Sequence, residues 1–362
     1  MGRDDNDRAT GDGVGYHHSA ASPLVYSRGP LVNRRRMRLL VTGGCGFIGS
    51  NFIRHVLEHY GPESVTNVDA LTYAGSLITT ADMASRFGER YEFCRADIAD
   101  PKRIEQIAQR HSYYGLINFA AESHVDRSIE SPENFIHTNI VGTSVLLEVA
   151  RRSGIKRFVQ ISTDEVYGSL GAEGRFTEQS PLRPSSPYSA SKASADLLVL
   201  AAHKTYDQEV VITRCSNNYG PYQFPEKLIP LMILRALADE PMPVYGDGLN
   251  VRDWIHVDDH CRAIFDVLME GKSGETYNVG AENERTNLEV VQAILEHLGK
   301  PETLIDFVED RPGHDRRYAI DATKIRRELG WKPLHTFERG LAETIDWYAR
   351  NRSWWTEAHR SR

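Results

Sequence analysis

A tyrosine and a lysine stand four residues apart in the segment Tyr188-Ser189-Ala190-Ser191-Lys192. In a helix this spacing places both side chains on one face, and Ser186-Pro187 is a helix-start signal. A phenol has an ordinary pKa near 10, so lowering it to about 7 requires roughly 4 kcal/mol. One ammonium about 4 Å away supplies roughly that amount at an effective dielectric constant of about 20. Tyr188 can then act as a base at neutral pH, although ordinary helices also contain this spacing.

Two neighbouring carboxylates, Asp164 and Glu165, come directly after Ser162-Thr163 and a predicted strand. One carboxyl group of such a pair can act as a general acid and the other as a base, provided that burial or like charge raises the pKa of the acid. An exposed acidic loop is the commoner role of an Asp-Glu pair. Both interpretations remain open on these residues alone.

A glycine-rich turn connects the first predicted strand to the first predicted helix. Glycines at such a turn allow a tight bend, a close approach of a pyrophosphate to the helix N-terminus, and close packing of helix on strand. We predict a dinucleotide-binding turn formed by Gly43, Gly46, Phe47, Ile48 and Gly49.

Two acidic residues at the ends of the next strands are candidates for contact with the same dinucleotide. Asp69 ends the second predicted strand, and a carboxylate there accepts hydrogen bonds from a free ribose hydroxyl but repels a 2′-phosphate. NAD is therefore predicted rather than NADP. Asp97, with Ile98 beside it, is a candidate for contact with the adenine; a helix N-cap before Asp100-Pro101 is an equally good interpretation of Asp97.

The elements that must position these residues alternate along the chain. The predicted strands are Arg38–Thr42, Ser64–Val68, Tyr91–Arg95, Gly115–Phe119, Arg157–Ile161 and Glu209–Arg214. The predicted helices between them are Phe47–Tyr60, Ala81–Phe87, Pro101–His111, Ser131–Arg152 and Tyr188–Tyr206. This alternation predicts an α/β fold of Rossmann type, with a doubly wound parallel sheet and ligands at the carboxyl ends of its strands.

The two ends of the chain depart from this pattern. Residues 1–36 show neither helical nor strand periodicity, so we expect a disordered tail, and Met37 is a candidate for the true start. We predict a cofactor domain over residues 37–215. Residues 216–362 are predicted to form a smaller, mixed α/β substrate-binding region, with some segments returning to the first domain. Its predicted helices are Val257–Glu270, Asn287–Leu298, Ala322–Leu329 and Thr336–Arg350.

Composition narrows the class of partner. The 362 residues include 43 Lys and Arg against 50 Asp and Glu, for a net charge of −7, which argues against nucleic-acid binding. Ordinary hydrophobic and charged fractions argue against a membrane-spanning chain. Four scattered cysteines disfavour a disulfide scaffold and a zinc site. We therefore expect a cytoplasmic protein with a small-molecule ligand and no metal.

Taken together, these motifs resemble the extended short-chain dehydrogenase/reductase family and, within it, the dTDP-glucose 4,6-dehydratase family. The resemblance runs from about Met37 to the C-terminus. Several strings carry it in the family's order: Ala121-Glu122-Ser123-His124-Val125-Asp126-Arg127-Ser128, Ser162-Thr163-Asp164-Glu165-Val166-Tyr167-Gly168, Ser216-Asn217-Asn218-Tyr219-Gly220-Pro221-Tyr222, Pro225-Glu226-Lys227-Leu228-Ile229-Pro230, Tyr245-Gly246-Asp247-Gly248, Arg252-Asp253-Trp254 and Arg311-Pro312-Gly313-His314-Asp315.

The resemblance implies a complete reaction. The C4 hydroxyl of dTDP-glucose is oxidised, water is eliminated across C5 and C6, and the hydride returns to C6. The implied roles are Tyr188 as the C4 base beside Lys192, Glu165 as the C5 base, Asp164 as the C6 acid, and Thr163 as hydrogen-bond partner of the C4 oxygen. Because the reaction is redox-neutral, NAD is expected to stay tightly bound and to be regenerated in each cycle.

The resemblance also implies a nucleotide-sugar lining. Cations and N–H donors suit a diphosphate, and amides suit a hexose; Arg252 and Arg311 are expected near the phosphates and Tyr245 near the base or ribose. Helix starts or caps are alternatives for Lys227 and Asn287. The complete expected set is His124, Thr163, Asn217, Lys227, Leu228, Pro243, Tyr245, Arg252, Asn287, Arg311 and His314.

The helices Ser131–Arg152 and Tyr188–Tyr206 carry more apolar residues than one sheet face needs. We therefore expect a homodimer through a four-helix bundle, as the resemblance also implies. The surplus apolar residues are Val145, Leu146, Leu147, Leu197, Leu198 and Leu200.

Three other functions compete with dehydration. A UDP-sugar 4-epimerase on the same scaffold needs Tyr188 and Lys192 but leaves Asp164 and Glu165 unexplained. A UDP-glucuronate decarboxylase has no use for an acid aimed at a C6 hydroxyl. A non-catalytic NAD-binding sensor has no need of any of the four residues.

Overall fold

The structure, a computed structural model, describes residues 36–310 and 314–360. The tail predicted over residues 1–36 lies outside the described residues except for Arg36. Arg311, one of the two expected phosphate contacts, also lies outside them.

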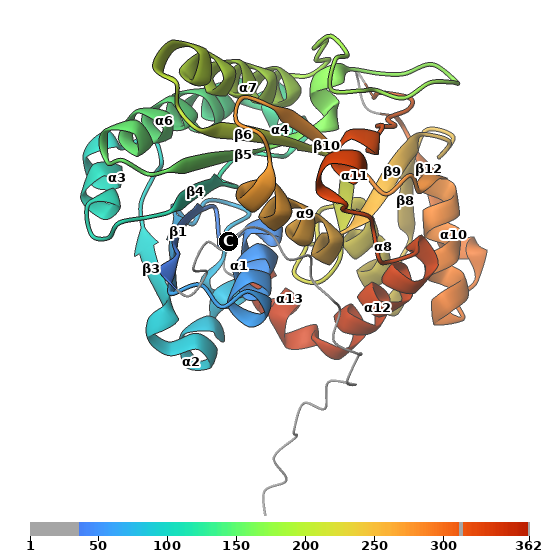
Figure 1. Cartoon of the computed structure of the whole chain (residues 1–362). Helices are drawn as coiled ribbons and strands as arrows, with labels where there is room; N and C mark the ends of the chain where they lie inside the picture. Colours follow the sequence, from blue (N-terminus) through green and yellow to red (C-terminus); the bar gives the residue numbers. More distant parts are fainter. Residues whose placement is uncertain (1–35, 311–313, 361–362) are drawn as a thin grey trace, which may run out of the picture. The chain divides into compact units, whose positions relative to one another are not determined.

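A seven-stranded parallel sheet lies at the centre of the described chain (Figure 1). Its strands are β1 (Arg38–Thr42), β2 (Ser64–Asp69), β3 (Tyr91–Arg95), β4 (Gly115–Asn118), β5 (Arg157–Thr163), β6 (Val210–Cys215) and β10 (Thr276–Val279). Their order in the sheet is β10-β6-β5-β4-β1-β2-β3. Because β1 lies between β2 and β4, the strand order reverses there, and ligands of such sheets bind at that switch point. The predicted doubly wound α/β fold is confirmed.

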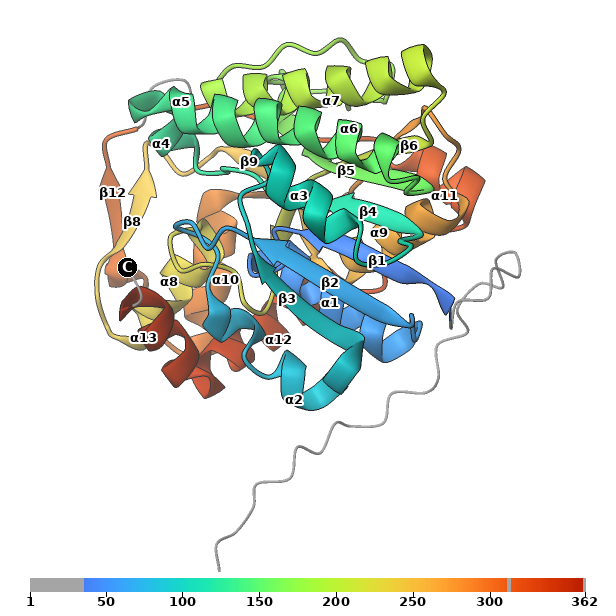
Figure 2. The same cartoon turned by 90° about the vertical axis from the view of Figure 1, so that its left-hand side faces the viewer.

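Helices cover both faces of this sheet (Figures 1 and 2). They are α1 (Phe47–His59), α2 (Met83–Phe87), α3 (Pro101–Ala108), α4 (Val125–Glu130), α5 (Pro132–Phe135), α6 (Thr143–Arg152), α7 (Pro187–Tyr206) and α9 (Val257–Glu270). Side chains alternate along β1, so that Leu40 packs toward α3, α6 and α7 while Leu39 and Val41 pack toward α1 and α9. Burial on both faces explains why the strands are almost continuously apolar.

The chain after residue 215 contributes to this sheet as well as to a second region. Strand β10 pairs in parallel with β6, from Thr276 opposite Ile212 to Val279 opposite Cys215, and α9 covers the face next to α1. The sequence pattern had predicted α9 but not β10, because a strand of four residues carries little periodicity.

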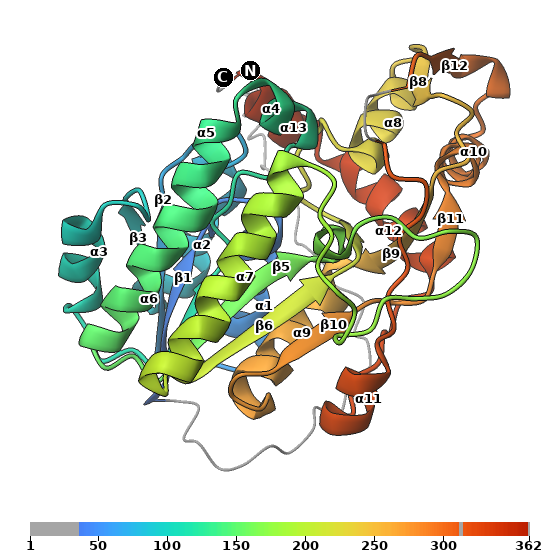
Figure 3. The ribbon, with the colours of Figure 1, turned by 90° about the horizontal axis from the view of Figure 1, so that it is seen from above.

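The second region lies toward the carboxyl ends of β5 and β6, which Figure 3 shows pointing at it. It contains two small sheets, with strand orders β11-β9-β7 and β12-β8. Its elements are β7 (Asn217–Tyr219), α8 (Leu228–Leu237), β8 (Met242–Tyr245), β9 (Val251–His256), β11 (Glu284–Thr286), α10 (Asn287–Leu298), β12 (Ile305–Val308), α12 (Phe337–Arg350) and α13 (Arg352–Arg360). Helix α11 (Thr323–Leu329) packs instead on β10 and α9 of the central sheet. None of the described helices has the length and apolarity needed to cross a bilayer.

The long helix predicted over Ser131–Arg152 is not regular. It consists of α5, a π-helical segment over Ile136–Gly142, and α6. Within the π-helical segment, Asn139 accepts a hydrogen bond from the Glu122 backbone N–H at 2.9 Å and donates to Ser191 Oγ at 2.8 Å. These long-range bonds accompany the widened turn, a type of irregularity that often marks functional sites.

Two further element bounds differ from expectation. The helix predicted over Ala81–Phe87 is shorter: a 3₁₀ turn covers Leu77–Thr80, and α2 begins only at Met83. Strand β5 runs beyond its predicted end at Ile161 to Thr163, because its pairing with β6 continues there. The longer strand places Asp164 directly at the carboxyl edge of the sheet.

Candidate active site

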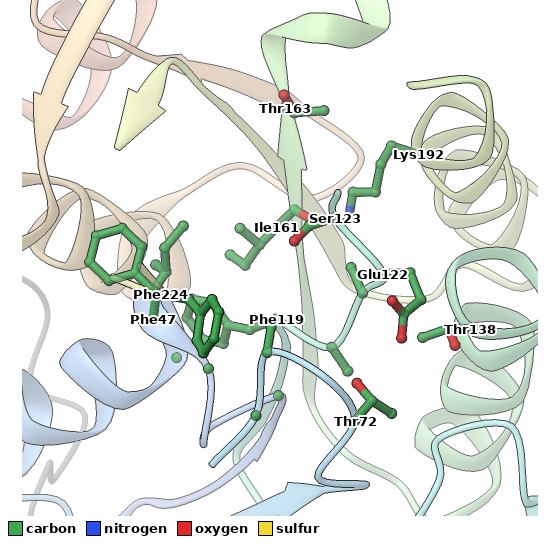
Figure 4. A pocket seen from close by; sticks show the side chains of 18 of the residues that line it. Phe47, Thr72, Phe119, Glu122, Ser123, Thr138, Ile161, Thr163, Lys192 and Phe224 are labelled. Carbon is green, nitrogen blue, oxygen red and sulfur yellow. Dashed lines mark hydrogen bonds between the residues drawn. The ribbon is translucent and has the colours of Figure 1, made fainter. Parts of the chain in front are cut away.

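One pocket opens at the carboxyl ends of the central strands, where Figure 4 shows a group of its lining side chains. It brings together every predicted cofactor and catalytic residue and three of the predicted substrate residues, of which Thr163 is also a predicted catalytic residue. The predicted residues that line it are Gly43, Gly46, Phe47, Ile48, Gly49, Asp69, Asp97, Ile98, Thr163, Asp164, Glu165, Tyr188, Lys192, Asn217 and Lys227.

The glycine turn between β1 and α1 has no room for side chains. Gly43 has φ +70°, and a Cβ there would lie 2.5 Å from the Ala120 backbone N. A Cβ on Gly49 would lie 2.4 Å from the Gly43 carbonyl oxygen. Such close packing is typical of a dinucleotide-binding turn, and the start of α1 at Phe47 and Ile48 lines the pocket.

The two acidic candidates differ in their surroundings. Asp69 is buried and accepts from the Cys45 N–H at 2.9 Å and the Leu71 N–H at 2.8 Å, so its carboxylate is held in the wall beside the turn. Asp97 is exposed at the pocket rim, with His137 Nε2 3.1 Å from its Oδ2. The helix-cap alternative for Asp97 is wrong, because Asp100 caps α3 by accepting from the N–H groups of Lys102 and Arg103.

The reaction centre lies between β5 and the start of α7. Ser186 caps α7, and both Tyr188 and Lys192 are buried on its inward face. Figure 4 shows Lys192 extending from α7 toward β5, where its Nζ donates to the carbonyl oxygen of Ile161 at 2.7 Å.

The electrostatics of Tyr188 differ from the expectation of a phenol made acidic by Lys192. Burial raises the pKa of Tyr188 well above its ordinary value, and the negative charge of Glu165 raises it further, while a hydrogen bond with Thr163 lowers it. Burial also lowers the pKa of Lys192. The expectation was wrong in omitting desolvation and the neighbouring carboxylate, both of which raise the pKa of Tyr188.

Asp164 has the character required of a general acid. Its side chain is buried, and burial together with the charges of Glu165 and Asp253 raises its pKa well above the ordinary value, against the opposing effect of Arg252. Thr163 Oγ1 donates to Asp164 Oδ1 at 3.4 Å, whereas Asp164 Oδ2 has no hydrogen-bond partner among the described residues. The direction of the pKa shift agrees with the sequence-based expectation, and the alternative of an exposed acidic loop is wrong.

Three predicted substrate residues lie beside this centre. Lys227 Nζ donates to the Ser123 carbonyl oxygen at 3.1 Å, and Asn217 lines the pocket from β7. His124 caps α4, and its Nε2 lies 3.8 Å from Glu226 Oε2, a carboxylate of the pocket wall.

The other described candidates belong to the second region. Arg252, in β9, is buried and donates to the carbonyl oxygen of Asp315 at 2.9 Å. Tyr245 ends β8, with its ring centroid 6.3 Å from that of His314. Asn287 begins α10 but does not cap it, because Thr286 does. Pro243 lies in β8 and Leu228 begins α8.

Several pocket residues were not among the predicted site residues. Figure 4 shows Phe119 and Phe224 toward one side of the pocket, the side of the predicted Phe47, and Glu122 and Thr138 toward the other. The rule that ligands bind at the carboxyl ends of parallel strands points to Phe119 and Glu122, because both follow β4. Phe224 and Thr138 carry no comparable signal.

Comparison with known proteins gives one consistent result. A family model described as GDP-mannose 4,6 dehydratase matches residues 40–344. The chain is 55% identical over 333 residues to the dTDP-glucose 4,6-dehydratase of Xanthomonas campestris pv. campestris, covering 87% of this chain and 94% of that protein.

Two solved structures are similar along nearly their whole length. The dTDP-glucose 4,6-dehydratase of Bacillus anthracis, in complex with NAD, has a TM-score of 0.82 and 50% identity, covering 89% of this chain and 99% of that one. The dTDP-glucose 4,6-dehydratase of Streptomyces venezuelae, with NAD and TYD bound, has a TM-score of 0.85 and 48% identity, covering 89% and 100%.

Proposed function

The chain belongs to the dTDP-glucose 4,6-dehydratase family, and from that premise we propose that it converts dTDP-glucose to dTDP-4-keto-6-deoxyglucose with NAD as its resident cofactor. The observation that carries the proposal is the position of Asp164 and Glu165. This acid and base line the same pocket as Tyr188, Lys192 and the glycine turn. A dehydratase uses all of these groups, whereas an epimerase uses only some of them.

The residues present fit NAD. The turn at Gly43 and Gly49 admits no Cβ, and Asp69 stands at the end of β2, where no cation of the described residues pairs with it to accept a 2′-phosphate. Gly43, Gly46 and Gly49 would hold the pyrophosphate, Asp69 the ribose, and Asp97 and Ile98 the adenine end. When bound, NAD supplies the redox chemistry by accepting a hydride from the sugar and later returning it.

Protein groups move the protons. Tyr188 takes the proton of the C4 hydroxyl while Thr163 hydrogen-bonds the C4 oxygen. The ketone at C4 acidifies the C5 hydrogen, which Glu165 removes. Asp164 donates a proton to the C6 hydroxyl, so that water leaves and a C5–C6 double bond forms. After the hydride has returned to C6, a proton is delivered back to C5. The raised pKa of Asp164 supports its role as the donor.

Residues of the second region favour the binding of a nucleoside diphosphate. Arg252 is a buried cation whose charge acts on Asp164, so it stands close to the reaction centre. We propose that it binds the diphosphate, and that Tyr245 and His314 contact the nucleoside. Lys227, Asn217 and His124 are proposed to contact the hexose.

We also propose a homodimer in the cytoplasm. Four large apolar side chains are exposed on the outward side of the helices from α4 to α7: Ile129, Ile136, Val141 and Leu197. Of the expected surplus residues, Leu146 and Leu147 are buried in the core instead, whereas Leu197 is 58% exposed. The four cysteines are buried free thiols, which suits a reducing compartment.

A substrate panel tests the function. The purified protein is incubated without added NAD with dTDP-, UDP-, GDP- and CDP-glucose and, separately, with UDP-glucuronate, and the masses of the products are measured by mass spectrometry. We expect loss of one water from dTDP-glucose. An isobaric galactose product indicates an epimerase, release of CO₂ from UDP-glucuronate indicates a decarboxylase, and no turnover at all contradicts the proposal.

A further inference from the structure

A buried ion pair lies behind the reaction centre, one helical turn beyond Lys192. Arg214 Nε donates to Asp196 Oδ2 at 2.9 Å, and the two side chains are 4% and 0% exposed. Arg214 Nη1 donates to the hydroxyl of Tyr167 at 3.0 Å, and this hydroxyl donates to Asn278 Oδ1 at 2.7 Å. Asp196 and Arg214 are not among the lining of the pocket, so the chemistry described above does not use them.

This ion pair and Lys192 attach α7 to the sheet at one level. Lys192 Nζ donates to the Ile161 carbonyl oxygen in β5, and Asp196 accepts from Arg214 in β6. Ser162, which follows Ile161, stands opposite Arg214 in the β5–β6 pairing. Two successive turns of α7 are therefore held next to the strand end that carries Thr163 and Asp164.

The charge of Asp196 acts on Lys192. Burial lowers the pKa of Lys192, while Asp196 and Cys215 act to raise it. Burial raises the pKa of the Cys215 thiol to about 12, so this group is neutral near pH 7. Arg214 and Lys192 in turn oppose the effect of burial on the pKa of Asp196. Asp196 is thus the carboxylate whose charge favours the protonated form of the buried Lys192.

We propose that Asp196 is a positioning residue of the dehydratase: held by Arg214, its carboxylate keeps the ammonium of Lys192 charged at the place where Lys192 donates to Ile161, one helical turn from Tyr188. This inference rests on the proposed roles of Tyr188 and Lys192. Lys192 thereby has a fixed counter-charge at the next helical position that faces the sheet, because residues four apart on a helix are neighbours.

The test is the pH profile of kcat/KM for dTDP-glucose. In Asp196→Asn, Lys192 loses its counter-charge and gives up its proton at lower pH. We expect the alkaline limb of the profile to move down by about 1 to 3 pH units, and kcat near pH 8 to fall by about tenfold or more with little change in KM.

A second variant distinguishes the loss of the Asp196 charge from a loss of stability. Removal of one partner of a buried ion pair is destabilising, whereas replacement of both by apolar residues of similar volume is often tolerated. We expect Asp196→Leu/Arg214→Met to unfold at a denaturant concentration closer to the wild-type value than Asp196→Asn does, and yet to show the shifted alkaline limb. A folded double variant with the wild-type profile overturns the proposal, because Asp196 is then only structural.

Asp259 provides a matched control. It is a buried acid of α9 that pairs with Arg262 at 2.9 Å and lies outside the pocket lining. Asp259→Asn is expected to lower stability and to keep the wild-type pH profile; an equal shift in this control also overturns the proposal. Failure of the wild-type protein to turn over dTDP-glucose contradicts the proposed function instead.

Discussion

Thr163 Oγ1 donates to Asp164 Oδ1 at 3.4 Å and also accepts from the Glu165 N–H at 3.2 Å. One hydroxyl thus contacts the carboxylate of Asp164 and the backbone of Glu165 at the end of β5. Asp164 Oδ2 makes no hydrogen bond within the described part of the chain. This oxygen is the one we expect to donate to the C6 hydroxyl of the sugar.

Replacement of this acid should separate oxidation from elimination. In Asp164→Asn the C4 base is intact but no proton is available at C6, so we expect overall dehydration to slow by about 10²- to 10⁴-fold. Reduced nicotinamide should accumulate and be visible in stopped-flow absorbance. Asp247→Asn, at an exposed carboxylate paired with Arg316, serves as the control with normal turnover. An unchanged dehydration rate in Asp164→Asn excludes the assigned role.

The hydride should stay within one active site. We expect substrate labelled with deuterium at C4 to give product labelled at C6, because the cofactor is regenerated in each cycle. Product NMR locates the label, and a mixture of labelled and unlabelled substrates reports any exchange between molecules. Appearance of the label in solvent contradicts the internal return of the hydride.

The glycine turn offers a matched pair of substitutions. Gly43 and Gly61 both have positive φ, but a Cβ at Gly43 meets the Ala120 backbone at 2.5 Å, whereas a Cβ at Gly61 meets nothing within 4 Å. Gly61→Ala should lower the free energy of unfolding by only about 1–2 kcal/mol, and Gly43→Ala by more. Urea unfolding measures the free energy of unfolding of both variants. The NAD content of purified Gly43→Ala shows whether the turn still holds the cofactor. Equal behaviour of the two variants contradicts the steric argument.

Asp253 should make stability depend on pH in a defined window. Burial raises its pKa from 3.8 to about 6, so the folded protein binds this proton more tightly than the unfolded chain does. The contribution of this proton to the free energy of unfolding is fully present below about pH 4 and is lost as the pH rises through 6. The free energy of unfolding of Asp253→Asn should therefore rise, relative to that of wild type, by on the order of 3 kcal/mol between pH 4 and pH 7.

Unfolding at both pH values measures this difference. Asp247→Asn again provides the control, because hydrogen bonding to Arg316 lowers the pKa of Asp247. Its contribution to stability has the opposite pH dependence and is lost only below about pH 4, so we expect the difference between Asp247→Asn and wild type to change little between pH 4 and pH 7. A pH-independent difference for Asp253→Asn shows that its proton is not retained on folding.

The exposed apolar side chains of α4 to α7 should carry the dimer contact. Ile136 and Leu197 are 52% and 58% exposed. We expect Ile136→Glu/Leu197→Glu to be monomeric by light scattering, because a buried unpaired charge opposes association. Phe307→Glu alters a side chain that is 56% exposed in β12, away from these helices, and should leave the dimer intact. A monomeric wild-type protein, or a dimer in both variants, contradicts this interface.

Signals that act over a few residues were readable from the sequence. The glycine turn, the Ser186 cap and the four-residue spacing of Tyr188 and Lys192 depend on local geometry, and the structure places them as expected. The parallel sheet followed from the alternation of apolar strands with amphipathic helices, since such strands need helices on both faces. The sequence motifs therefore predicted both the fold class and the residues that line the pocket.

Tertiary structure decided what depends on residues far apart in the chain. The pKa of Asp164 depends on burial and on the charges of Asp253 and Arg252 in β9, and no local sequence pattern brings these residues together. The same holds for the pair formed by Asp196 and Arg214, whose partners come from a helix and a strand. Desolvation and charge in the folded protein govern these pKa values, which is why the sequence named the acid and the base but misjudged the electrostatics of Tyr188.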